Sequence, residues 1–214
     1  MAPFGTIYTW GPGNPRVARA TAIANLNGLE ISVPEFSLQT DRTPEWYAKF
    51  PLGKVPAFES ASGDVLLTET LAITHYLALS GPRSHQLLGR TPAESAQIQQ
   101  WTAHAEVEFW PPIQIFNQIL RGFRPADDAV IAENKGKIAR ALEYAEKILE
   151  GRKWIAGTEE ITVADVSLAS VLNVAFKAIL GKEERKYPKV LEWFERVTDV
   201  EEVKRAFGER VYKE

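Results

Sequence analysis

The sequence predicts two consecutive domains of different class, an α/β unit in residues 1–81 and an all-helical domain in residues 90–214. Three observations lead to this prediction. Short β-branched and aromatic runs alternate with helical patterns in the first part of the chain. Residues 81–89 show no apolar periodicity, which is typical of a linker. Beyond Thr91, every periodic segment has the spacing of a helix.

The composition favours a folded globular protein without a nucleic-acid partner. Its 214 residues, 45% of them hydrophobic, can bury roughly 70% of the surface that the unfolded chain exposes. The net charge of −3 is spread over both halves, which argues against binding to nucleic acid or to an anionic membrane. The chain has no cysteine, so disulfides, thiolate metal sites and a cysteine nucleophile are excluded.

The sequence also predicts a cytoplasmic protein. Met1-Ala2-Pro3-Phe4-Gly5 lacks the basic flank and apolar core of a secretory signal. No segment approaches the roughly 18 apolar residues of a membrane span. The absence of cysteine agrees with a reducing compartment. The histidines at 75, 85 and 104 are too scattered to predict a metal site, so no metal is expected.

The first elements are expected to form a βαβ unit. Residues 4–9 are a predicted strand that runs into the loop Gly11-Pro12-Gly13. Asn14 and Pro15 provide the cap and first residue of a helix that ends at Asn27-Gly28. Residues 30–33 alternate and predict a second strand, parallel to the first.

The next elements complete the first unit. Thr43-Pro44-Glu45 begins a short helix that ends before Pro51. Two strands, 55–59 and 65–67, are joined by the turn Ser62-Gly63-Asp64, and a helix runs from Thr68 or Glu69 to about Ser80. This order of elements is that of a thioredoxin-like unit.

Capping signals organise the second domain. Thr91-Pro92-Ala93-Glu94 predicts a capping box, and its helix should kink or break at Pro111-Pro112 before it resumes to about Arg121. Asp127 caps a helix that ends at Gly151. Thr162-Val163-Ala164-Asp165 is a second capping box, with Ile161 and Val166 placed for a hydrophobic staple. The helix after it is apolar nearly all round and belongs in the middle of a bundle, and two shorter helices follow near 190–197 and 200–207.

Two stretches predict a site for a small zwitterionic peptide. Pro56 opens a strand, so the backbone of Val55 is left unpaired within the sheet and the Val55-Pro56 bond can be cis. Glu69 and Thr70 begin a helix, whose first turn suits a carboxylate, while Glu69 itself can take an ammonium group. The alternative is that Pro56 only starts a strand and Glu69-Thr70 only caps a helix.

Three motifs in this order resemble the cytosolic glutathione transferases over essentially the whole chain: Gly53-Lys54-Val55-Pro56-Ala57-Phe58, Glu69-Thr70 and Thr162-Val163-Ala164-Asp165. Within that superfamily the chain most resembles the transferase-like domain of the translation elongation factor 1B gamma subunit and the fungal transferases similar to it. The runs that carry this likeness are Gly5-Thr6-Ile7-Tyr8-Thr9, Arg42-Thr43-Pro44-Glu45, residues 49–59, Gly89-Arg90-Thr91-Pro92 and Pro111-Pro112. The gamma subunit continues beyond this domain, so the chain is either a stand-alone transferase or an excised domain.

The resemblance implies a glutathione site. It implies that the backbone of Val55 pairs with the cysteinyl part of glutathione, that Pro56 is cis, and that Glu69 and Thr70 hold the γ-glutamyl end. For the glycine carboxylate it leaves Lys54 and Arg42 as candidates. A solvated loop lysine is the alternative for Lys54.

The thiol activator should lie at the end of the first strand. Lowering a thiol pKa of about 8.5 by two units takes roughly 2.7 kcal/mol, and one or two hydrogen bonds of about 1.5 to 3 kcal/mol each suffice. No serine lies between Thr9 and Arg19, and Tyr8 sits inside the strand. The donors near the strand end are Thr9, the Trp10 indole, Asn14 and Arg16. Asn14 resembles the asparagine that opens the first helix in fungal and bacterial transferases without a catalytic serine or tyrosine. This resemblance makes Asn14 and Thr9, assisted by Arg16, the expected catalytic residues, although Asn14 could equally be only a helix cap.

An acceptor pocket for an apolar electrophilic small molecule is expected between the domains, and His104 is a further candidate to face it. Its candidate residues are Trp10, Phe36, Glu106, Phe109, Trp110, Ile113 and Phe116, which could instead be core. The leading hypothesis is a homodimeric glutathione transferase that conjugates or isomerises an electrophile, in detoxification or secondary metabolism. The rivals are a non-catalytic scaffold of an elongation factor 1B gamma subunit and a glutathione-binding redox or carrier protein.

Overall fold

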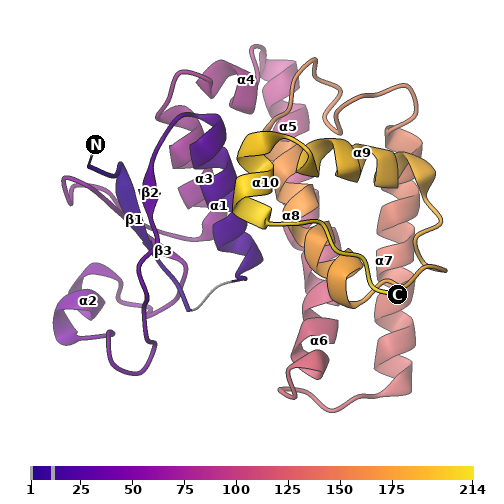
Figure 1. Ribbon diagram of the computed structural model, residues 1–214, viewed down its shortest axis with the longest axis horizontal. Coiled ribbons are helices and arrows are strands. Elements are labelled where there is room, and N and C mark those ends of the chain that lie inside the picture. The colour runs from indigo at the N-terminus through magenta and orange to yellow at the C-terminus, as the bar shows by residue number, and fades with distance from the viewer. Residues whose placement is uncertain (1, 11–12) are drawn as a thin grey trace.

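A computed structural model describes residues 2–10 and 13–214 of the chain (Figure 1). Gly11 and Pro12, part of the loop expected after the first strand, lie outside these residues. One four-stranded sheet has the order β2-β1-β3-β4. Its strands are β1 (Gly5–Tyr8), β2 (Ile31–Ser32), β3 (Ala57–Ser60) and β4 (Leu66–Thr68). The pair β1 and β2 is parallel and the other two pairs are antiparallel, so the predicted thioredoxin-like arrangement is confirmed.

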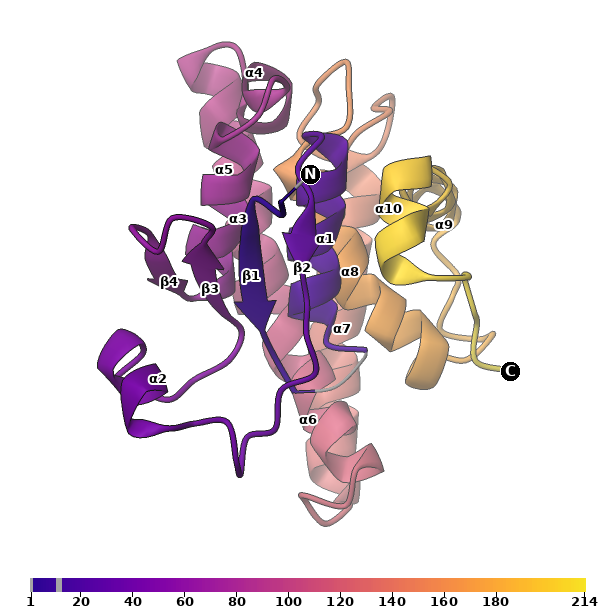
Figure 2. The ribbon, with the colours of Figure 1, turned by 60° about the vertical axis from the view of Figure 1, so that its left-hand side comes forward.

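Helices cover both faces of this sheet. Helices α1 (Pro15–Leu26) and α3 (Thr70–Leu79) pack against each other, and α1 also contacts α8 and α10 of the second domain. Figure 2 shows α1 between the sheet and α8. A separate small core holds the short helix α2 (Pro44–Lys49) and is formed by Trp46, Phe50 and Ala57. The first domain therefore meets the second through α1.

The expected linker contains a helix that the sequence analysis missed. Residues Ser84–Leu88 form α4, and Leu87 within it is fully buried. The prediction of a plain loop over 81–89 is wrong for these five residues. A helix of little more than one turn between glycines is too short to show an apolar period.

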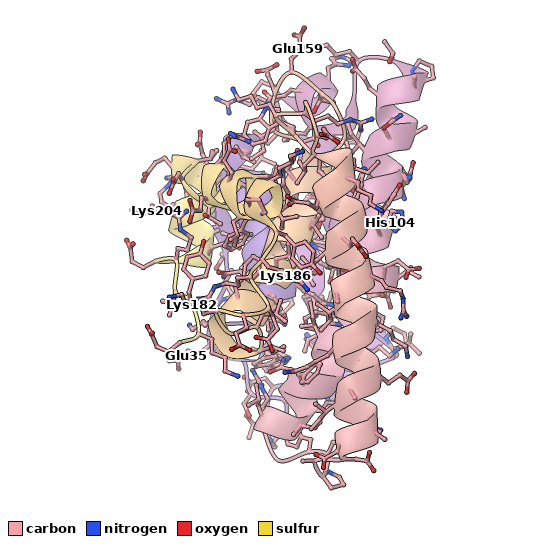
Figure 3. The ribbon with its side chains drawn as sticks, turned by 90° about the vertical axis from the view of Figure 1, so that its right-hand side faces the viewer. Glu35, His104, Glu159, Lys182, Lys186 and Lys204 are labelled. Carbon is pink, nitrogen blue, oxygen red and sulfur yellow. The ribbon has the colours of Figure 1, made fainter. Side chains whose placement is uncertain are left out.

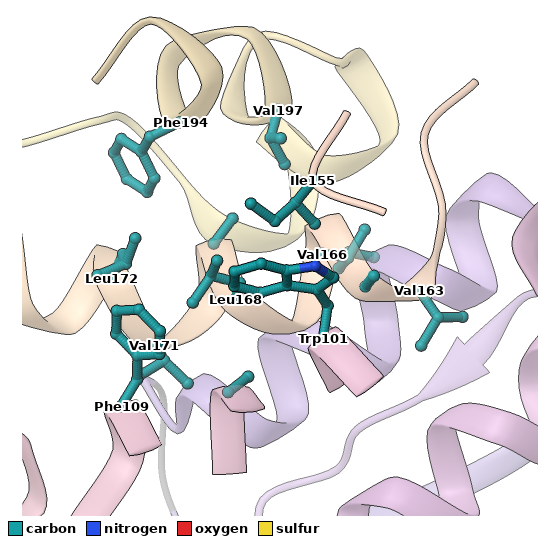
Figure 4. Packing of buried hydrophobic residues seen from close by; sticks show 14 of the residues in the cluster. Trp101, Phe109, Ile155, Val163, Val166, Leu168, Val171, Leu172, Phe194 and Val197 are labelled. Atoms are coloured by element: carbon teal, nitrogen blue, oxygen red, sulfur yellow. The ribbon is translucent and has the colours of Figure 1, made fainter. Parts of the chain in front are cut away.

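The second domain is all helical, as predicted. Its elements are α5 (Pro92–His104), the π-helical segment η1 (Ala105–Phe109), α6 (Trp110–Leu120), α7 (Asp128–Ile148), α8 (Val163–Ala178), α9 (Pro188–Thr198) and α10 (Glu201–Phe207). Helix α8 is buried almost throughout and lies at the centre. In Figure 4 its Leu168 lies beside Trp101 of α5, and its Leu172 lies on the same side of the cluster as Phe194 of α9. None of the described helices is long and apolar enough to cross a membrane.

The kink expected at the two prolines takes the form of a π-helical segment. Proline has no N–H and collides with the carbonyl one turn earlier, so Pro111 and Pro112 disturb the turn that precedes them. The N–H of Trp110 accordingly donates to the carbonyl of Ala105, five residues back. Segment η1 thus joins α5 to α6 in one continuous helical rod.

The two predicted capping boxes differ in how completely they form. At α5 the Thr91 hydroxyl accepts from the N–H of Glu94 at 3.2 Å, but the Glu94 carboxylate accepts from the N–H of Arg90 at 2.7 Å instead of from Thr91. The reciprocal half of that box is therefore displaced by one residue.

At α8 the box is complete and extended. Asp165 accepts from the N–H and the hydroxyl of Thr162, both at 3.0 Å, and from the N–H of Ile155 and the indole of Trp193, both at 2.8 Å. Burial raises the pKa of Asp165, and these four donors oppose the rise. The fully buried carboxylate ties the start of α8 to the loop before it and to α9.

Candidate functional site

The backbone of Val55 is free to bind a ligand. The Val55-Pro56 peptide bond is cis, as the resemblance implied. The β3 ladder begins only at Ala57, which pairs with Tyr8 on one side and Thr68 on the other. Within residues 2–10 and 13–214, neither the N–H nor the C=O of Val55 takes part in a hydrogen bond. Such groups need a partner, and an extended peptide can supply one.

The backbone N–H groups in the first turn of α3 also lack a side-chain cap. Glu69 precedes it with φ +65°, the one positive φ outside glycine among the described residues. Its side chain is exposed and makes no capping bond, so the alternative of a simple cap is not supported. Thr70 is buried at the first position of the helix. Strained backbone of this kind is typical of binding sites, and the free N–H groups of a first turn favour a carboxylate.

Thr9 and Asn14 form a buried pair at the end of β1. The Asn14 amide donates to the Thr9 hydroxyl at 3.0 Å, while its carbonyl oxygen caps α1 by accepting from the N–H of Arg16 at 3.1 Å. Because Thr9 accepts this bond, its own hydroxyl proton remains available. One amide hydrogen of Asn14 is available as well. Asn14 is thus a cap and a donor at once.

Tyr8 is engaged elsewhere. Its phenol donates to one oxygen of Glu59 at 2.9 Å, and Lys49 contacts the other oxygen at 2.6 Å. Burial, together with the hydrogen bond to Glu59, raises the pKa of Tyr8 to about 12. The side chain is a strand aromatic packed on Phe36, Trp46 and Phe50, which leaves Thr9 and Asn14 as the donors at the strand end.

The two cationic residues that are candidates to bind the glycine carboxylate lie in loops on either side of α2. Lys54 is exposed in the loop that follows this helix. Arg42 is half-buried before it, and its Nε has no partner in the part of the chain that the structure describes. The buried indole N–H of Trp46 is likewise unpaired within those residues. Trp46 was not predicted as a site residue, since nothing local in the sequence distinguishes this indole from a core side chain.

A cavity of about 460 Å³ lies between the two domains. Its first wall includes Trp10, Asn14, Pro15, Arg16, Leu38 and Val55, and its second wall includes Trp110, Gln114, Asn117, Gln118, Arg121 and Phe123. Val55 and Asn14 therefore line the same space. Six of these twelve side chains are polar or charged. Of the candidate acceptor residues, Trp10 and Trp110 line this cavity.

Arginines and tryptophans are paired across this region. The Arg16 guanidinium carbon lies 5.2 Å from the centre of the Trp110 ring, and that of Arg121 lies 4.7 Å from the Trp10 ring. Both are cation–π contacts that hold a flat guanidinium against an indole. Behind them, Glu106 receives Arg16 at 3.5 Å and the buried Arg19. Burial lowers the pKa of Arg19, and Glu106 opposes that change.

The other candidate acceptor residues are not brought to the interdomain cavity. Ile113 and Phe116 are buried in the core, and the Glu106 carboxylate is held by the two arginines. Phe36 lines a separate hollow with Thr9 and Asp41. Phe109 lines another.

That further cavity, of about 690 Å³, lies within the helical domain between η1, α6 and α7. His104 and Tyr144 line it with their ring centres 5.5 Å apart. Figure 3 views the molecule onto α7, with His104 labelled beside that helix. The expectation that His104 faces the interdomain cleft is therefore wrong. No group of three metal-ligating side chains occurs among the described residues.

Two family models match this chain. The model described as "Glutathione S-transferase, N-terminal domain" matches residues 5–79, which include Val55 and Glu69. The model described as "Glutathione S-transferase, C-terminal domain" matches residues 109–201, which include α6 and α8.

Individual proteins are similar over the same range. "Glutathione S-transferase-like protein LUC7" of Fusarium sp is 46% identical over 210 residues, covering 97% of this chain and 94% of that protein. "Elongation factor 1-gamma" of Danio rerio is 32% identical over 211 residues, covering 96% of this chain and 46% of that protein. The solved glutathione transferase URE2P6 of Phanerochaete chrysosporium, in complex with oxidized glutathione, has a TM-score of 0.84 over 98% of this chain and 97% of its own, at 21% identity. This last likeness concerns the fold.

Proposed function

This chain belongs to the glutathione transferase superfamily, and on that premise we propose that it binds glutathione, ionises its thiol, and delivers the sulfur to an electrophile or uses it for an isomerisation. One observation carries the proposal. The unpaired backbone of Val55 and the donor pair formed by Thr9 and Asn14 flank one strand end, and the uncapped start of α3 belongs to the same sheet domain. Each of these groups matches a different part of the tripeptide.

The ends of glutathione are charged, and the chain offers a partner for each. Thr70 and the first turn of α3 would receive the γ-glutamyl carboxylate, and the exposed carboxylate of Glu69 would receive the ammonium group. Lys54 or Arg42 would neutralise the glycine carboxylate. The Val55 backbone would hold the cysteinyl part as an added strand.

The chemistry then needs only hydrogen-bond donors. The Thr9 hydroxyl and the remaining amide hydrogen of Asn14 would donate to the sulfur, and Arg16 would add positive charge. Their combined effect would favour the thiolate, whose proton leaves to water. The sulfur lone pair then forms a bond to the electrophilic carbon, and the leaving group, such as chloride on a nitroaromatic ring, departs with the electrons of its own bond.

Calorimetric titration with glutathione at neutral pH tests the proposal. We expect a dissociation constant below about 1 mM, and weaker binding would overturn the assignment. Thr9→Val and Asn14→Asp remove one donor each, and the aspartate keeps the α1 cap. With 1-chloro-2,4-dinitrobenzene we expect each to lower the rate about ten- to hundredfold, because the bound thiol pKa rises by one to two units. Thr9→Ser, which keeps the hydroxyl, is the matched control, and unchanged rates in all three variants would reject these residues.

A non-catalytic scaffold is the second candidate, since elongation factor 1-gamma shares 32% identity with this chain. A scaffold has no need for an unpaired backbone at Val55 or for an uncapped helix start at Glu69. The two candidates separate in one experiment. Glutathione binding without turnover of any electrophile supports the scaffold or a carrier, whereas turnover that depends on Thr9 and Asn14 supports the transferase.

The proposal includes a homodimer, with the first domain of one subunit against the first helices of the second domain of the other. Exposed apolar side chains on these elements, Leu71 of α3, Val107 of η1 and Tyr144 of α7, support this arrangement. Sedimentation equilibrium should give twice the 23.9 kDa chain mass. A monomer at micromolar concentration would contradict it.

A further inference from the structure

We propose that the electrophile accepted in the interdomain cavity is an anion, a flat or aromatic molecule that carries a carboxylate or similar group away from its reacting carbon. This inference rests on the proposed transferase function and names the substrate class of that same site. It comes from the charges and the polar stripe that line the cavity.

Positive charge exceeds negative charge around the cavity. Arg16 and Arg121 line it, and no carboxylate is found among its described lining residues. Arg16 shares the single carboxylate of Glu106 with the buried Arg19, so one negative charge faces two positive charges. Arg121 has no acidic partner in the described part of the chain. A cavity with this balance attracts anions and repels cations.

The cavity wall formed by α6 is polar, because its polar residues recur at helical spacing. Gln114, Asn117 and Gln118 follow the spacing i, i+3 and i+4, so they share one face of that helix, and Arg121, its C-cap residue, follows at i+7. The opposite face of α6 carries Ile113 and Phe116 into the core. Amide side chains beside a guanidinium offer several N–H donors to a carboxylate.

The two indole rings define the body of the molecule that fits. Trp10 and Trp110 line the cavity, and each holds an arginine over its face. A guanidinium lying flat on an indole keeps its N–H edge free for a carboxylate. Aromatic molecules also stack on guanidinium planes, so arginine–indole pairs of this kind suit a flat aromatic molecule.

The different groups on the two cavity walls determine the orientation of the bound electrophile. Val55 and Asn14, where the sulfur is expected, lie on the wall of the first domain, and the polar stripe lies on the wall of the second. The electrophilic carbon therefore points to the first wall and the anionic group to the second. The anionic group and the reacting carbon must lie at opposite ends of the molecule.

The test compares two acceptors that differ only in charge, 4-chloro-3,5-dinitrobenzoate and its neutral amide. For each, kcat/KM at saturating glutathione is divided by the rate constant of the uncatalysed reaction with glutathione. We expect the wild type to favour the benzoate about tenfold, and Arg121→Gln to reduce this preference to less than about threefold. Arg205→Gln, an exposed arginine on α10, is the matched control and should keep the preference. Added salt should lower kcat/KM for the benzoate and leave that for the amide unchanged.

The outcomes separate this inference from the function on which it rests. Turnover of both acceptors with no preference for the benzoate overturns the anionic substrate and leaves the transferase intact. Turnover of neither acceptor, with no glutathione binding, overturns the transferase itself. If Arg121→Gln instead raises the KM for glutathione equally with both acceptors, the arginine serves a glutathione carboxylate, and the inference is wrong.

Discussion

The starts of α3 and α8 differ in how their capping groups are paired. Thr162 and Asp165 at α8 are buried, and every donor that surrounds the Asp165 carboxylate is paired with it. At α3, Glu69 is exposed at φ +65° and caps nothing. We call the start of α8 closed, because its capping groups are paired within the protein, and the start of α3 open, because it has no side-chain cap.

The difference teaches how this fold divides stability from binding. Closing a helix end with internal donors and acceptors stabilises the folded state, because buried polar groups without partners are costly. Leaving an end open costs stability locally but keeps N–H groups for a ligand. The bundle centre carries the first kind of start, and the edge of the sheet domain carries the second.

The largest effect is expected where the closed start is opened. Asp165→Asn replaces one carboxylate oxygen by an amide NH2 group, which faces hydrogen-bond donors. At least one buried hydrogen bond is therefore lost, and its donor is left without a partner. We expect the free energy of unfolding to fall by about 3 kcal/mol, measured by urea denaturation. Asp64→Asn, in an exposed turn, is the control and should change it by less than about 0.5 kcal/mol. A loss as small for position 165 as for position 64 would remove the basis of the comparison.

The next effect concerns the open start. Glu69→Gln removes the charge expected to hold the ammonium group, and we expect the dissociation constant for glutathione to rise about tenfold. Stability should hardly change, because the side chain is exposed and makes no capping bond. Calorimetry and urea denaturation measure the two quantities, with Glu143→Gln on the surface of α7 as control. Unchanged binding would mean that this carboxylate serves no ligand.

A helix start between the two extremes gives a smaller effect. Asp127 caps α7 by accepting from the N–H of Val130 at 3.0 Å, in an exposed position. Asp127→Ala should therefore lower the free energy of unfolding by about 1 kcal/mol, well short of the loss at Asp165. Asp127→Ser keeps a capping oxygen and should recover most of it. A loss as large as that of Asp165→Asn would show that burial is not what separates the two caps.

The smallest expected effect has the opposite sign. Glu69→Gly relieves the positive φ, a strain of about 1 to 1.5 kcal/mol, but glycine loses about 0.5 to 1 kcal/mol in chain entropy. We expect a net gain of about 0.5 kcal/mol in stability, together with weaker glutathione binding than the wild type. If the variant is instead less stable than the wild type, the strained backbone is not a cost of keeping this start open.

Most of the fold could be predicted because its signals act within a few residues. Asn14, Thr43 and Asp127 each cap a helix where the sequence predicts it. The cis bond before Pro56 and the membership of the superfamily were likewise predicted and are confirmed. A short helix between glycines, such as α4, gives no such signal, and the partner chosen by Glu94 depends on where the chain before Thr91 turns.

The site could be predicted only in part. The residues expected to hold glutathione were found from motifs, and their role stays a prediction. The polar stripe of α6 is visible in the sequence, but which side of that helix meets the cavity depends on its packing against α7 and α8. The contact between Arg19 and Glu106 joins positions 87 residues apart, so no local pattern could indicate that Glu106 supports arginines instead of lining the pocket.

The number of residues in the π-helical segment between α5 and α6 determines which side of α6 faces the interdomain cavity. A π-bulge is equivalent to one residue inserted into an α-helix, and one residue corresponds to a rotation of about 100°. Deleting a single residue from Ala105–Phe109 would turn α6 on its axis relative to α5, and the amides and Arg121 would swing away from Trp10. Relatives that take the same class of molecule should therefore conserve the length of this segment, even where its side chains have diverged.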